Sequence, residues 1–340
     1  MRSILVSTLA LVSFTLGRPS TLKAATWKSL ATIPSPRQEH STVSLKDHIY
    51  IVAGVFADFS TTGHVDVYNP KTNTWADPPP APVPVGLNHP NVAVVNDKIY
   101  VLGGLAVDAT GSWSAVNNSF VYDPRTNKWT DLPPFPADAI PRGSAAMGVH
   151  EDTIYLAGGM RQLVLMEGGL QDTVSTVTTF NVRTGKWATG LPDMPAARDH
   201  AGAAVIDNVL YVVGGRDHGQ PNVRGTVFTL DLATCHSSPS KATWVIRNTT
   251  MPTPRGGLCA AAVDETIYTF GGEGNLAAES GVFPQVEAYN TRTNKWTQLE
   301  NMPNPRHGTS ATTVRGKIYI PGGGDLIGGH PMVINEVFSL

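Results

Sequence analysis

A motif that recurs six times constrains this chain more than any other feature of its sequence. Each copy has an aromatic residue, two further residues and then a small pair, which is Gly-Gly in five copies and Ala53-Gly54 in the first. The aromatic residues are Tyr50, Tyr100, Tyr155, Tyr211, Tyr268 and Tyr319, at separations of 50, 55, 56, 57 and 51 residues. Such a period is typical of repeated supersecondary units, and it overrides the prior of about two domains for a chain of this length.

A tryptophan that closes a predicted hairpin follows every copy except the last. These residues are Trp75, Trp129, Trp187, Trp244 and Trp296. Four of the hairpins read YNPKTNTW, YDPRTNKW, FNVRTGKW and YNTRTNKW, whereas the hairpin before Trp244 is longer. Their turn residues, which tolerate the left-handed conformation of a short hairpin turn, are Asn73, Asn127, Gly185 and Asn294.

The tyrosine, glycine and tryptophan marks at these offsets resemble the Kelch-repeat family, and the resemblance covers nearly all of the chain. It implies an all-β fold, a six-bladed Kelch β-propeller whose blades each contain four strands, a to d from the axis outward. Trp27 precedes the first tyrosine, and no tryptophan follows the last one. We therefore expect the N-terminal strand to close the last blade as its strand d, which removes the open edge of the sheet.

The N-terminal segment reads as a signal peptide. Arg2 precedes an apolar run from residue 4 to 17, which is too short to span a bilayer. We expect residues 1–20 to be the signal and residues 21–340 the propeller, so that the protein is secreted to the extracellular space and spans no membrane after cleavage; an uncleaved anchor is the alternative. Two glycosylation sequons, at Asn117 and Asn248, agree with export.

The net charge bears on which partners the protein can bind, and the cysteine content bears on a possible disulfide. The net charge is −2 and no basic stripe is present, which disfavours nucleic acid as a partner. Cys235 and Cys259 are the two cysteines. Export would permit a disulfide between them, but Cys259 lies in a predicted strand and Cys235 in a hairpin insertion, so two unreactive thiols are the alternative.

Ring geometry predicts which face of the molecule carries function. The d–a and b–c connections share one face, and the short a–b turns, such as Lys46-Asp47, share the other with the c–d turns. The b–c connections are long and varied, the longest running from residue 160 to 173. Long connections on a rigid scaffold are common binding sites, so we expect the functional site on the d–a/b–c face.

Arginine recurs 13 residues before the tyrosine in five of the six repeats. These residues are Arg37, Arg142, Arg198, Arg255 and Arg306, and Leu87 replaces them in the second repeat. We treat them as candidate ligand-binding residues at the channel mouth. The alternative is an architectural role, in which each guanidinium caps carbonyls or pairs with a carboxylate inside its blade.

Polar residues that differ between repeats are the stronger candidates. Two positions after the arginine come Glu39, His89, Ser144 and His200, which would point the same way along an extended strand. The b–c connections add Arg216, Asp217, His218, Glu273, Asp325 and His330. The candidate catalytic residues are Glu39, His200, Asp217 and Glu273; His89, Arg216, His218 and His307 are further candidate ligand contacts. Neighbours such as Asp199 and His200 would face opposite sides of a strand, so we expect pairs between blades instead.

Apolar residues join the same face. Trp113 is the one tryptophan outside the repeat pattern and lies in the second b–c connection, with Phe56 and Phe59 in the first. The third contains an apolar stretch of Leu163, Val164, Leu165 and Met166. An aromatic rim around a polar centre suits a small organic ligand or a sugar ring, and simple packing between loops is the alternative.

We predict no cofactor. Galactose oxidase has a Kelch-type propeller with a copper site, but neither cysteine here lies in a matching motif. The iron motif E-x3-D-x3-H of plant specifier proteins is also absent from the sequence. A three-histidine metal site from His89, His200 and His307 is the alternative that geometry leaves open.

The sequence favours a secreted binding module for a small molecule, a glycan or an extracellular protein. The alternative is a metal-independent isomerase, epimerase or cyclase acting in the same pocket by proton transfer. The chain resembles free-standing secreted Kelch proteins of fungi and bacteria, among which bacterial sialic-acid epimerases are enzymes. No catalytic motif of that group matches residue by residue, so whether the chain is an enzyme stays open here.

Overall fold

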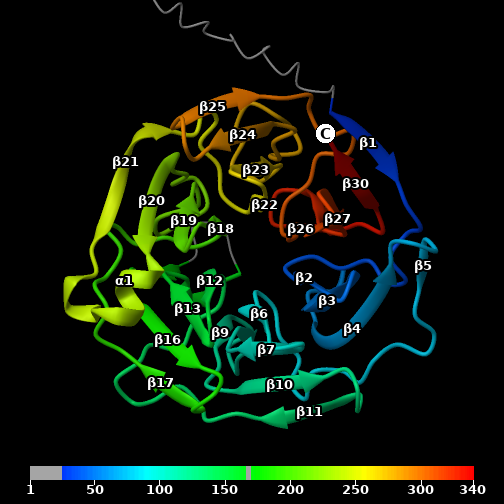
Figure 1. Cartoon of the computed structure of the whole chain (residues 1–340). Helices are drawn as coiled ribbons and strands as arrows, with labels where there is room; N and C mark the ends of the chain where they lie inside the picture. The colour runs from blue at the N-terminus through cyan, green and yellow to red at the C-terminus, as the bar shows by residue number, and fades with distance from the viewer. Residues whose placement is uncertain (1–24, 166–169) are drawn as a thin grey trace, which may run out of the picture.

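Six four-stranded antiparallel sheets lie around a common axis in the part of the chain that the computed structural model describes, residues 25–165 and 170–340 (Figure 1). Five of them follow chain order from the axis outward. The first contains β2 (Ser41–Leu45), β3 (His48–Val55), β4 (Thr61–Asn69) and β5 (Thr74–Trp75). The second contains β6 (Val92–Val95), β7 (Lys98–Leu102), β10 (Ser119–Asp123) and β11 (Lys128–Asp131).

The next three sheets repeat this order. The third contains β12 (Ala146–His150), β13 (Thr153–Ala157), β16 (Val177–Asn181) and β17 (Lys186–Ala188). The fourth contains β18 (Gly202–Ile206), β19 (Val209–Val213), β20 (Thr226–Asp231) and β21 (Trp244–Thr250). The fifth contains β22 (Cys259–Val263), β23 (Thr266–Phe270), β24 (Val286–Asn290) and β25 (Lys295–Gln298).

The remaining sheet combines the two ends of the described chain. It consists of β26 (Thr312–Val314), β27 (Lys317–Pro321), β30 (Asn335–Ser339) and, outermost, β1 (Thr26–Ser29). β1 pairs antiparallel with β30, from Thr26 opposite Ser339 to Ser29 opposite Glu336. The innermost strands contact one another in the cyclic order β2, β6, β12, β18, β22, β26 and back to β2.

The apolar core lies between neighbouring sheets. Tyr50 of β3 packs edge-on against Tyr122 of β10, with ring centroids 6.4 Å apart, and the same cluster includes Val67 and Val101. Central strands such as β13 are buried along their whole length. This explains why their sequences are continuously apolar, because both faces of each central strand are covered.

The predicted left-handed turns of the four hairpins are confirmed by backbone conformation. The hairpin residues Asn73, Asn127, Gly185 and Asn294 have φ between 53° and 66°. The a–b turns have two successive left-handed residues, as at Lys46 and Asp47, with φ of 51° and 63°. The longer hairpin before Trp244 contains a short helix, α1 (Leu232–Ser237), and a 3₁₀ turn, Pro239–Lys241. No helix among the described residues is long and apolar enough to cross a membrane.

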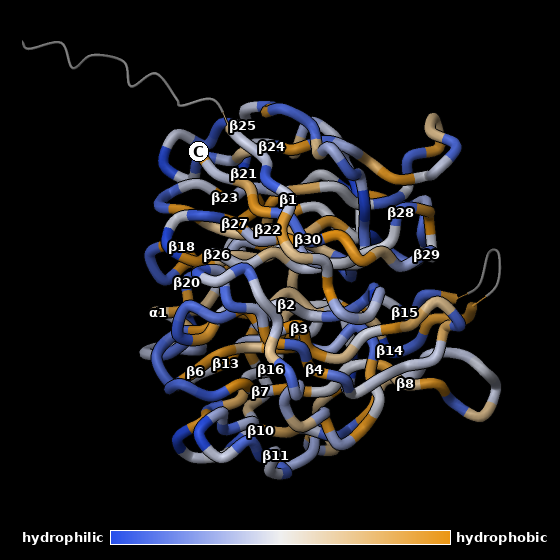
Figure 2. The backbone as a smooth tube through the Cα atoms, turned by 90° about the vertical axis from the view of Figure 1, so that its right-hand side faces the viewer, coloured by the Kyte–Doolittle hydropathy of each residue, from blue (hydrophilic) through white to orange (hydrophobic). Residues whose placement is uncertain are grey.

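The b–c connections are more ordered than the sequence indicated. In the second and third repeats they form hairpins, β8 (Leu105–Val107) with β9 (Trp113–Ala115) and β14 (Met160–Leu163) with β15 (Gln171–Thr173). β9 and β14 pair, which joins the hairpins into one sheet. In the last repeat β28 (Gly324–Leu326) pairs with β29 (Gly329–Pro331). Figure 2 shows β8, β14, β15, β28 and β29 on one side of the molecule and α1 on the other.

Candidate functional site

A ring of six equivalent residues surrounds the axis just before each innermost strand. All six have left-handed backbone conformation, with φ between 47° and 63°. They are Glu39, His89, Ser144, His200, Gly257 and Gly308. The expectation that the arginine and the residue two positions later lie on one extended strand is therefore wrong, because β2 begins at Ser41 and this turn comes first. The arginine and the ring residue consequently do not point the same way.

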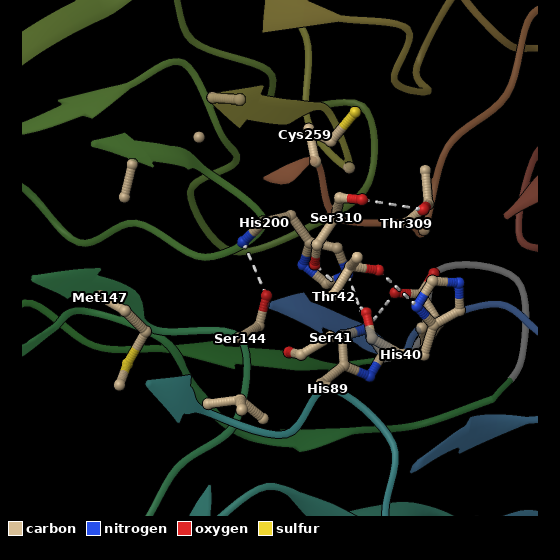
Figure 3. Close-up of a pocket in the computed structure, with 18 of the residues that line it drawn as sticks. His40, Ser41, Thr42, His89, Ser144, Met147, His200, Cys259, Thr309 and Ser310 are labelled. Atoms are coloured by element: carbon tan, nitrogen blue, oxygen red, sulfur yellow. Dashed lines mark hydrogen bonds and ion pairs between the residues drawn. The ribbon is translucent and has the colours of Figure 1, made fainter. Parts of the chain in front are cut away.

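Hydrogen bonds link the ring residues in a closed circle. Each backbone N–H donates to an oxygen of a neighbouring ring residue, as in Glu39 to Gly308 O (2.6 Å), His89 to Glu39 O (2.8 Å), Ser144 to His89 O (2.9 Å), Gly257 to His200 O (3.0 Å) and Gly308 to Gly257 O (3.2 Å). The sixth link runs from His200 N–H to Ser144 Oγ, at 3.0 Å (Figure 3). Donors and acceptors that would otherwise be buried and unpaired are thereby satisfied.

Two cavities meet at this ring. The inner one, of about 220 Å³, is lined by ring residues and the first residues of the innermost strands, including Ser41, Thr42 and Cys259 (Figure 3). The outer one, of about 790 Å³, lies among the b–c connections. Glu39, His89 and His200 line both cavities. These three side chains are the boundary between them.

The five repeated arginines bond within their own sheets. Arg37 pairs with Asp66, and Arg255 and Arg306 pair with Glu287 and Glu336 at 2.5 and 2.6 Å. Arg142 donates to the carbonyls of Ile140 and Leu156, and Arg198 to Ala197 O and Thr226 Oγ1.

All five are buried, and none of them lines either cavity. The architectural alternative therefore accounts for Arg37, Arg142, Arg198, Arg255 and Arg306, and we leave them out of the site.

Glu39, His89 and His200 converge at one point, although each comes from a different sheet. His89 Nε2 lies 2.9 Å from Glu39 Oε2 and 2.9 Å from His200 Nε2. The other ring nitrogen of each histidine is held by an acceptor: His89 Nδ1 donates to Asn88 Oδ1 at 2.6 Å, and His200 Nδ1 to Asp199 Oδ1 at 2.5 Å. With Nδ1 protonated, a neutral ring presents a lone pair at Nε2.

A second group of charges adjoins this point. Arg216 Nη1 lies 2.6 Å from Glu273 Oε1, and its Nε lies 3.5 Å from Asp199 Oδ1. Glu273 also accepts from Gln220 Nε2 at 3.0 Å and from the Gly328 N–H at 2.9 Å. His307 Nδ1 lies 3.6 Å from Glu39 Oε1 and 3.5 Å from Glu273 Oε2. All of these charged groups are buried.

Charge compensation fixes the protonation of the site. Burial alone would raise the pKa of Glu39, but His89, His200 and His307 together hold it well below its usual range. Burial would likewise raise the pKa of Glu273, whereas His307 and Arg216 lower it further. Burial, and then the Arg216 charge, lower the pKa of His200. At neutral pH the two carboxylates are therefore ionised.

Glycines make room for these side chains. A Cβ at Gly308 would lie 2.5 Å from Glu39 Oε1, and one at Gly256 would lie 2.3 Å from Arg216 Cγ. A Cβ at Gly257 would lie 3.3 Å from Glu273 Cγ. The sequence interpretation missed these residues because it looked for side chains that carry chemistry. The signal was glycine at the two positions after the repeated arginine, at Gly256 and Gly257 in the fifth repeat and at Gly308 in the sixth, where the first, second and fourth repeats have larger residues.

Apolar residues form the wall of the outer cavity. Phe59, Trp113, Leu163, Val164 and Leu165 line it. Trp113 is only 3% exposed and packs under the wall with Val55, Leu105 and Met160, whereas Phe59 is 44% exposed. Trp113 therefore serves packing between the loops, whereas Phe59 presents an exposed aromatic surface at the cavity. Met166 lies outside the described residues.

The predicted polar candidates divide into two groups. The outer cavity is lined by Glu39, His89, His200, Arg216, His218 and Glu273, and His307 contacts two of them. Asp217 pairs with His218 at 2.6 Å on the partly exposed rim, and Asp325 pairs with His330 away from the lining. The expectation that sequence neighbours do not pair is wrong for Asp199 and His200, because the backbone is left-handed there, with φ of 51° at His200.

Both cysteines are free and buried. Cys235 lies in α1, and Cys259 begins β22 in another core cluster. The two residues are therefore separate thiols and form no disulfide with each other.

Comparisons with known proteins agree with this architecture. Residues 10–159 and 160–340 match the KLHDC2/KLHL20/DRC7 Kelch-repeats domain. The chain is 43% identical over 328 residues to the Kelch-like protein terF of Aspergillus terreus, which covers 95% of this chain and 68% of that protein. It is 30% identical over 212 residues to Kelch-like protein 35 of Mus musculus, covering 62% of this chain and 32% of that protein. The chain thus matches only about a third of the mouse protein.

A solved structure shares the fold. The structure of YjhT superimposes with a TM-score of 0.74 at 16% sequence identity, over 92% of this chain and 97% of that one. At this identity the likeness concerns the fold alone. Together with the six-fold recurrence of tyrosine and glycine marks, these matches show that the chain belongs to the Kelch-repeat family.

Proposed function

We propose that this Kelch protein binds a small, partly apolar organic molecule, such as a substituted ring or a sugar, in the outer cavity. The observation that carries the proposal is the cavity itself. Its volume of about 790 Å³ falls in the range of small-molecule sites. Its floor is formed by buried charged groups, and its wall by Phe59 and neighbouring aliphatic side chains.

Exposed apolar side chains around the cavity support the proposal. In the part of the chain that the structure describes, eight of the eleven exposed large hydrophobic residues belong to b–c connections: Phe59, Val107, Leu165, Leu170, Leu276, Leu326, Ile327 and Val333. Leu276, which lines the cavity, is 85% exposed. Apolar surface gathered on one face is typical of a binding site, whereas single exposed hydrophobic residues are common everywhere.

The closed ring is part of the proposal. We take the six radial sheets as the six blades of one propeller, closed by β1 in the last blade. The pairing of β1 with β30 and the cyclic contacts of the innermost strands support this arrangement. A closed ring would hold the three boundary side chains, which come from three sheets, in fixed positions.

An enzyme that moves a proton is the second candidate. A carboxylate and two histidines within hydrogen-bond distance, at the floor of a cavity, are groups that general acid–base catalysis uses. An isomerase, epimerase or cyclase would use Glu39 or a histidine on a bound molecule. Incubation of a ligand in D₂O tests this candidate, since proton abstraction from carbon would exchange a hydrogen that NMR detects. Loss of that exchange in Glu39→Gln would support it.

Export is a further part of the proposal, and the predicted signal peptide lies outside the described residues. Asn117 and Asn248 are both exposed, as glycosylation requires. Expression in a eukaryotic secretory host, followed by removal of N-linked glycans and mass measurement, tests this part. Loss of the mass shift in the double variant Asn117→Gln/Asn248→Gln would assign the glycans to these sequons.

A thermal-shift screen with small organic molecules and monosaccharides tests ligand binding. A ligand at 100 times its dissociation constant stabilises the folded state by about 2.7 kcal/mol. We expect Phe59→Ala to weaken a ligand found in this way about fivefold, because about 1 kcal/mol of aromatic contact is lost. Ile246→Ala, on the outermost strand β21, is the control and should bind normally. Equal affinity for both variants would place the ligand elsewhere, and a screen without any ligand would favour a protein partner.

A further inference from the structure

Glu39, His89 and His200 have the composition and spacing of a metal site. Among the described residues their ligand atoms lie within 4.8 Å of one another, and all three residues are buried. Both distances from His89 Nε2, to Glu39 Oε2 and to His200 Nε2, are 2.9 Å. Atoms bound at right angles to one metal ion, with bonds of about 2.0–2.1 Å, lie about 2.9 Å apart. The observed spacing matches adjacent positions of an octahedral site.

The hydrogen bonds behind the histidines use Nδ1, so Nε2 is the nitrogen of each ring that can bind a metal ion. Asn88 Oδ1 and Asp199 Oδ1 accept from the two Nδ1–H groups. Histidines that bind metals commonly donate their other N–H to a carbonyl or carboxylate in this way, which fixes the tautomer and the ring orientation. Asp199 is held in turn by Thr173 Oγ1 and Arg216. The two Nε2 atoms, 2.9 Å apart, lie beside a carboxylate oxygen, and each can present a lone pair to a metal ion.

Buried carboxylates outnumber buried guanidinium groups around this point. The buried groups around it include three carboxylates, Glu39, Asp199 and Glu273, but only one guanidinium, Arg216. Buried charges are stable only when they are paired or coordinate a metal. A single divalent ion would add two positive charges to this carboxylate-rich group and could accept a lone pair from each of the three side chains.

We propose that Glu39, His89 and His200 bind one divalent first-row transition metal ion at the boundary between the two cavities. Two imidazoles and one carboxylate suit Zn²⁺, Fe²⁺, Mn²⁺ or Co²⁺, whereas Ca²⁺ and Mg²⁺ favour all-oxygen sites. Both cavities reach the three side chains, so the remaining coordination positions are open to water or to an oxygen of a bound molecule. The site uses no copper motif and does not include His307. It does not depend on the proposed small-molecule function.

Titration of the full chain with metal alone tests the proposal. After the protein has been stripped with a chelator, Co²⁺ should bind at one ion per chain and give a visible absorption band, which Zn²⁺ removes by displacement. A hundredfold excess of Mg²⁺ should leave the band unchanged. In the Co²⁺ protein, NMR should show two shifted, exchangeable signals from the two histidine Nδ1–H groups. Failure of a small-molecule screen would leave these results unaffected.

Variants assign the site. Glu39→Gln and His89→Gln should each weaken Zn²⁺ binding at least tenfold, and Asp199→Asn, which disturbs the support of His200, by about 10–100-fold. His48→Gln is the matched control, because this histidine lies at the start of β3, beside an a–b turn. Circular dichroism identifies any variant that fails to fold. If a variant does, the two histidine NMR signals of the unaltered Co²⁺ protein decide whether two histidines bind the ion. The proposal is overturned if the stripped chain binds neither Co²⁺ nor Zn²⁺, or if both ligand variants bind as tightly as the control.

Discussion

Arg216 and Glu273 form a buried ion pair, with Nη1 2.6 Å from Oε1, although they are 57 residues apart and follow the central strands of two neighbouring sheets. Arg216 is 1% and Glu273 2% exposed. Gly256 leaves the space that the Arg216 side chain occupies. The pair therefore joins the fourth and fifth repeats at the face that carries the outer cavity.

Glu273→Gln should destabilise the protein at neutral pH. The substitution leaves Arg216 with Asp199 alone, at 3.5 Å, and breaking a buried pair costs about 3–5 kcal/mol. Because the pKa of Glu273 is lower in the folded than in the unfolded chain, its contribution is present above about pH 4.3 and is lost as the pH falls further. Urea unfolding at pH 7 and at about pH 2.5 should show a large loss at pH 7 and a smaller one at the lower pH.

Glu279→Gln is the control for this experiment, since Glu279 is exposed in the same b–c connection. Its free energy of unfolding should stay within about 0.5 kcal/mol of the unaltered protein at both pH values. An equal loss for Glu273→Gln at pH 7 and at about pH 2.5 would show that the carboxylate charge is not the cause.

Asn73 links its hairpin to the segment that precedes the first sheet. Its Oδ1 accepts from Tyr68 Oη at 2.7 Å and from the Ala31 N–H at 2.8 Å, and Trp75 Nε1 donates to Ala31 O at 3.1 Å. Asn73→Gly keeps the left-handed backbone but removes both side-chain hydrogen bonds. We expect a loss of about 1–2 kcal/mol in chemical denaturation.

The equivalent residue of the third repeat provides the reverse test. Gly185 has φ of 66°, and a Cβ there would meet nothing within 4 Å. Gly185→Asn should therefore change stability by less than about 0.5 kcal/mol. If Asn73→Gly is as neutral as Gly185→Asn, the hydrogen bonds to Ala31 and Tyr68 do not hold the hairpin in place.

The repeat marks predicted most of the scaffold because each mark has a local physical cause. Left-handed conformation at Asn73 and at Lys46-Asp47 follows from short hairpins, and the apolar run through Tyr155 follows from burial on both faces. The same reasoning located the face that carries the outer cavity, because the direction of one strand fixes the face of every connection.

The details of the site depend on contacts between repeats, which the sequence does not display. The left-handed turn at His200 was missed because alternation along a strand was assumed before the strand had begun. Arg37 was placed at the channel mouth because nothing near it in sequence identifies Asp66 as its partner. The pairing of β9 with β14 joins two connections from different repeats, so neither sequence alone predicts it.

Trp27 should contribute strongly to the stability of the last sheet. It packs against Phe338 of β30 and Phe270 of β23, with ring centroids 5.1 and 5.8 Å away. Trp27→Ala should lower the free energy of unfolding by about 2–3 kcal/mol, somewhat less than for a fully buried tryptophan, and Trp27→Phe by less. Removing residues 1–29 should expose the unpaired edge of β30. Because such an edge can pair with another chain, the truncated protein should self-associate, which size-exclusion chromatography detects. A monomeric truncated chain with unchanged melting temperature would contradict this role for β1.

The two thiols should be unreactive in the folded protein. Burial, with a smaller effect of Asp231, raises the pKa of Cys235 to about 11, and burial raises the pKa of Cys259 to about 12. At pH 8 only about one Cys235 in a thousand is then the reactive thiolate, and fewer for Cys259. A colorimetric thiol reagent should therefore react slowly with the native protein and rapidly with two thiols in guanidinium chloride. Cys235→Ser should reduce the count to one. Two fast-reacting thiols without denaturant would contradict the burial of these groups, and none after unfolding without reductant would indicate a disulfide.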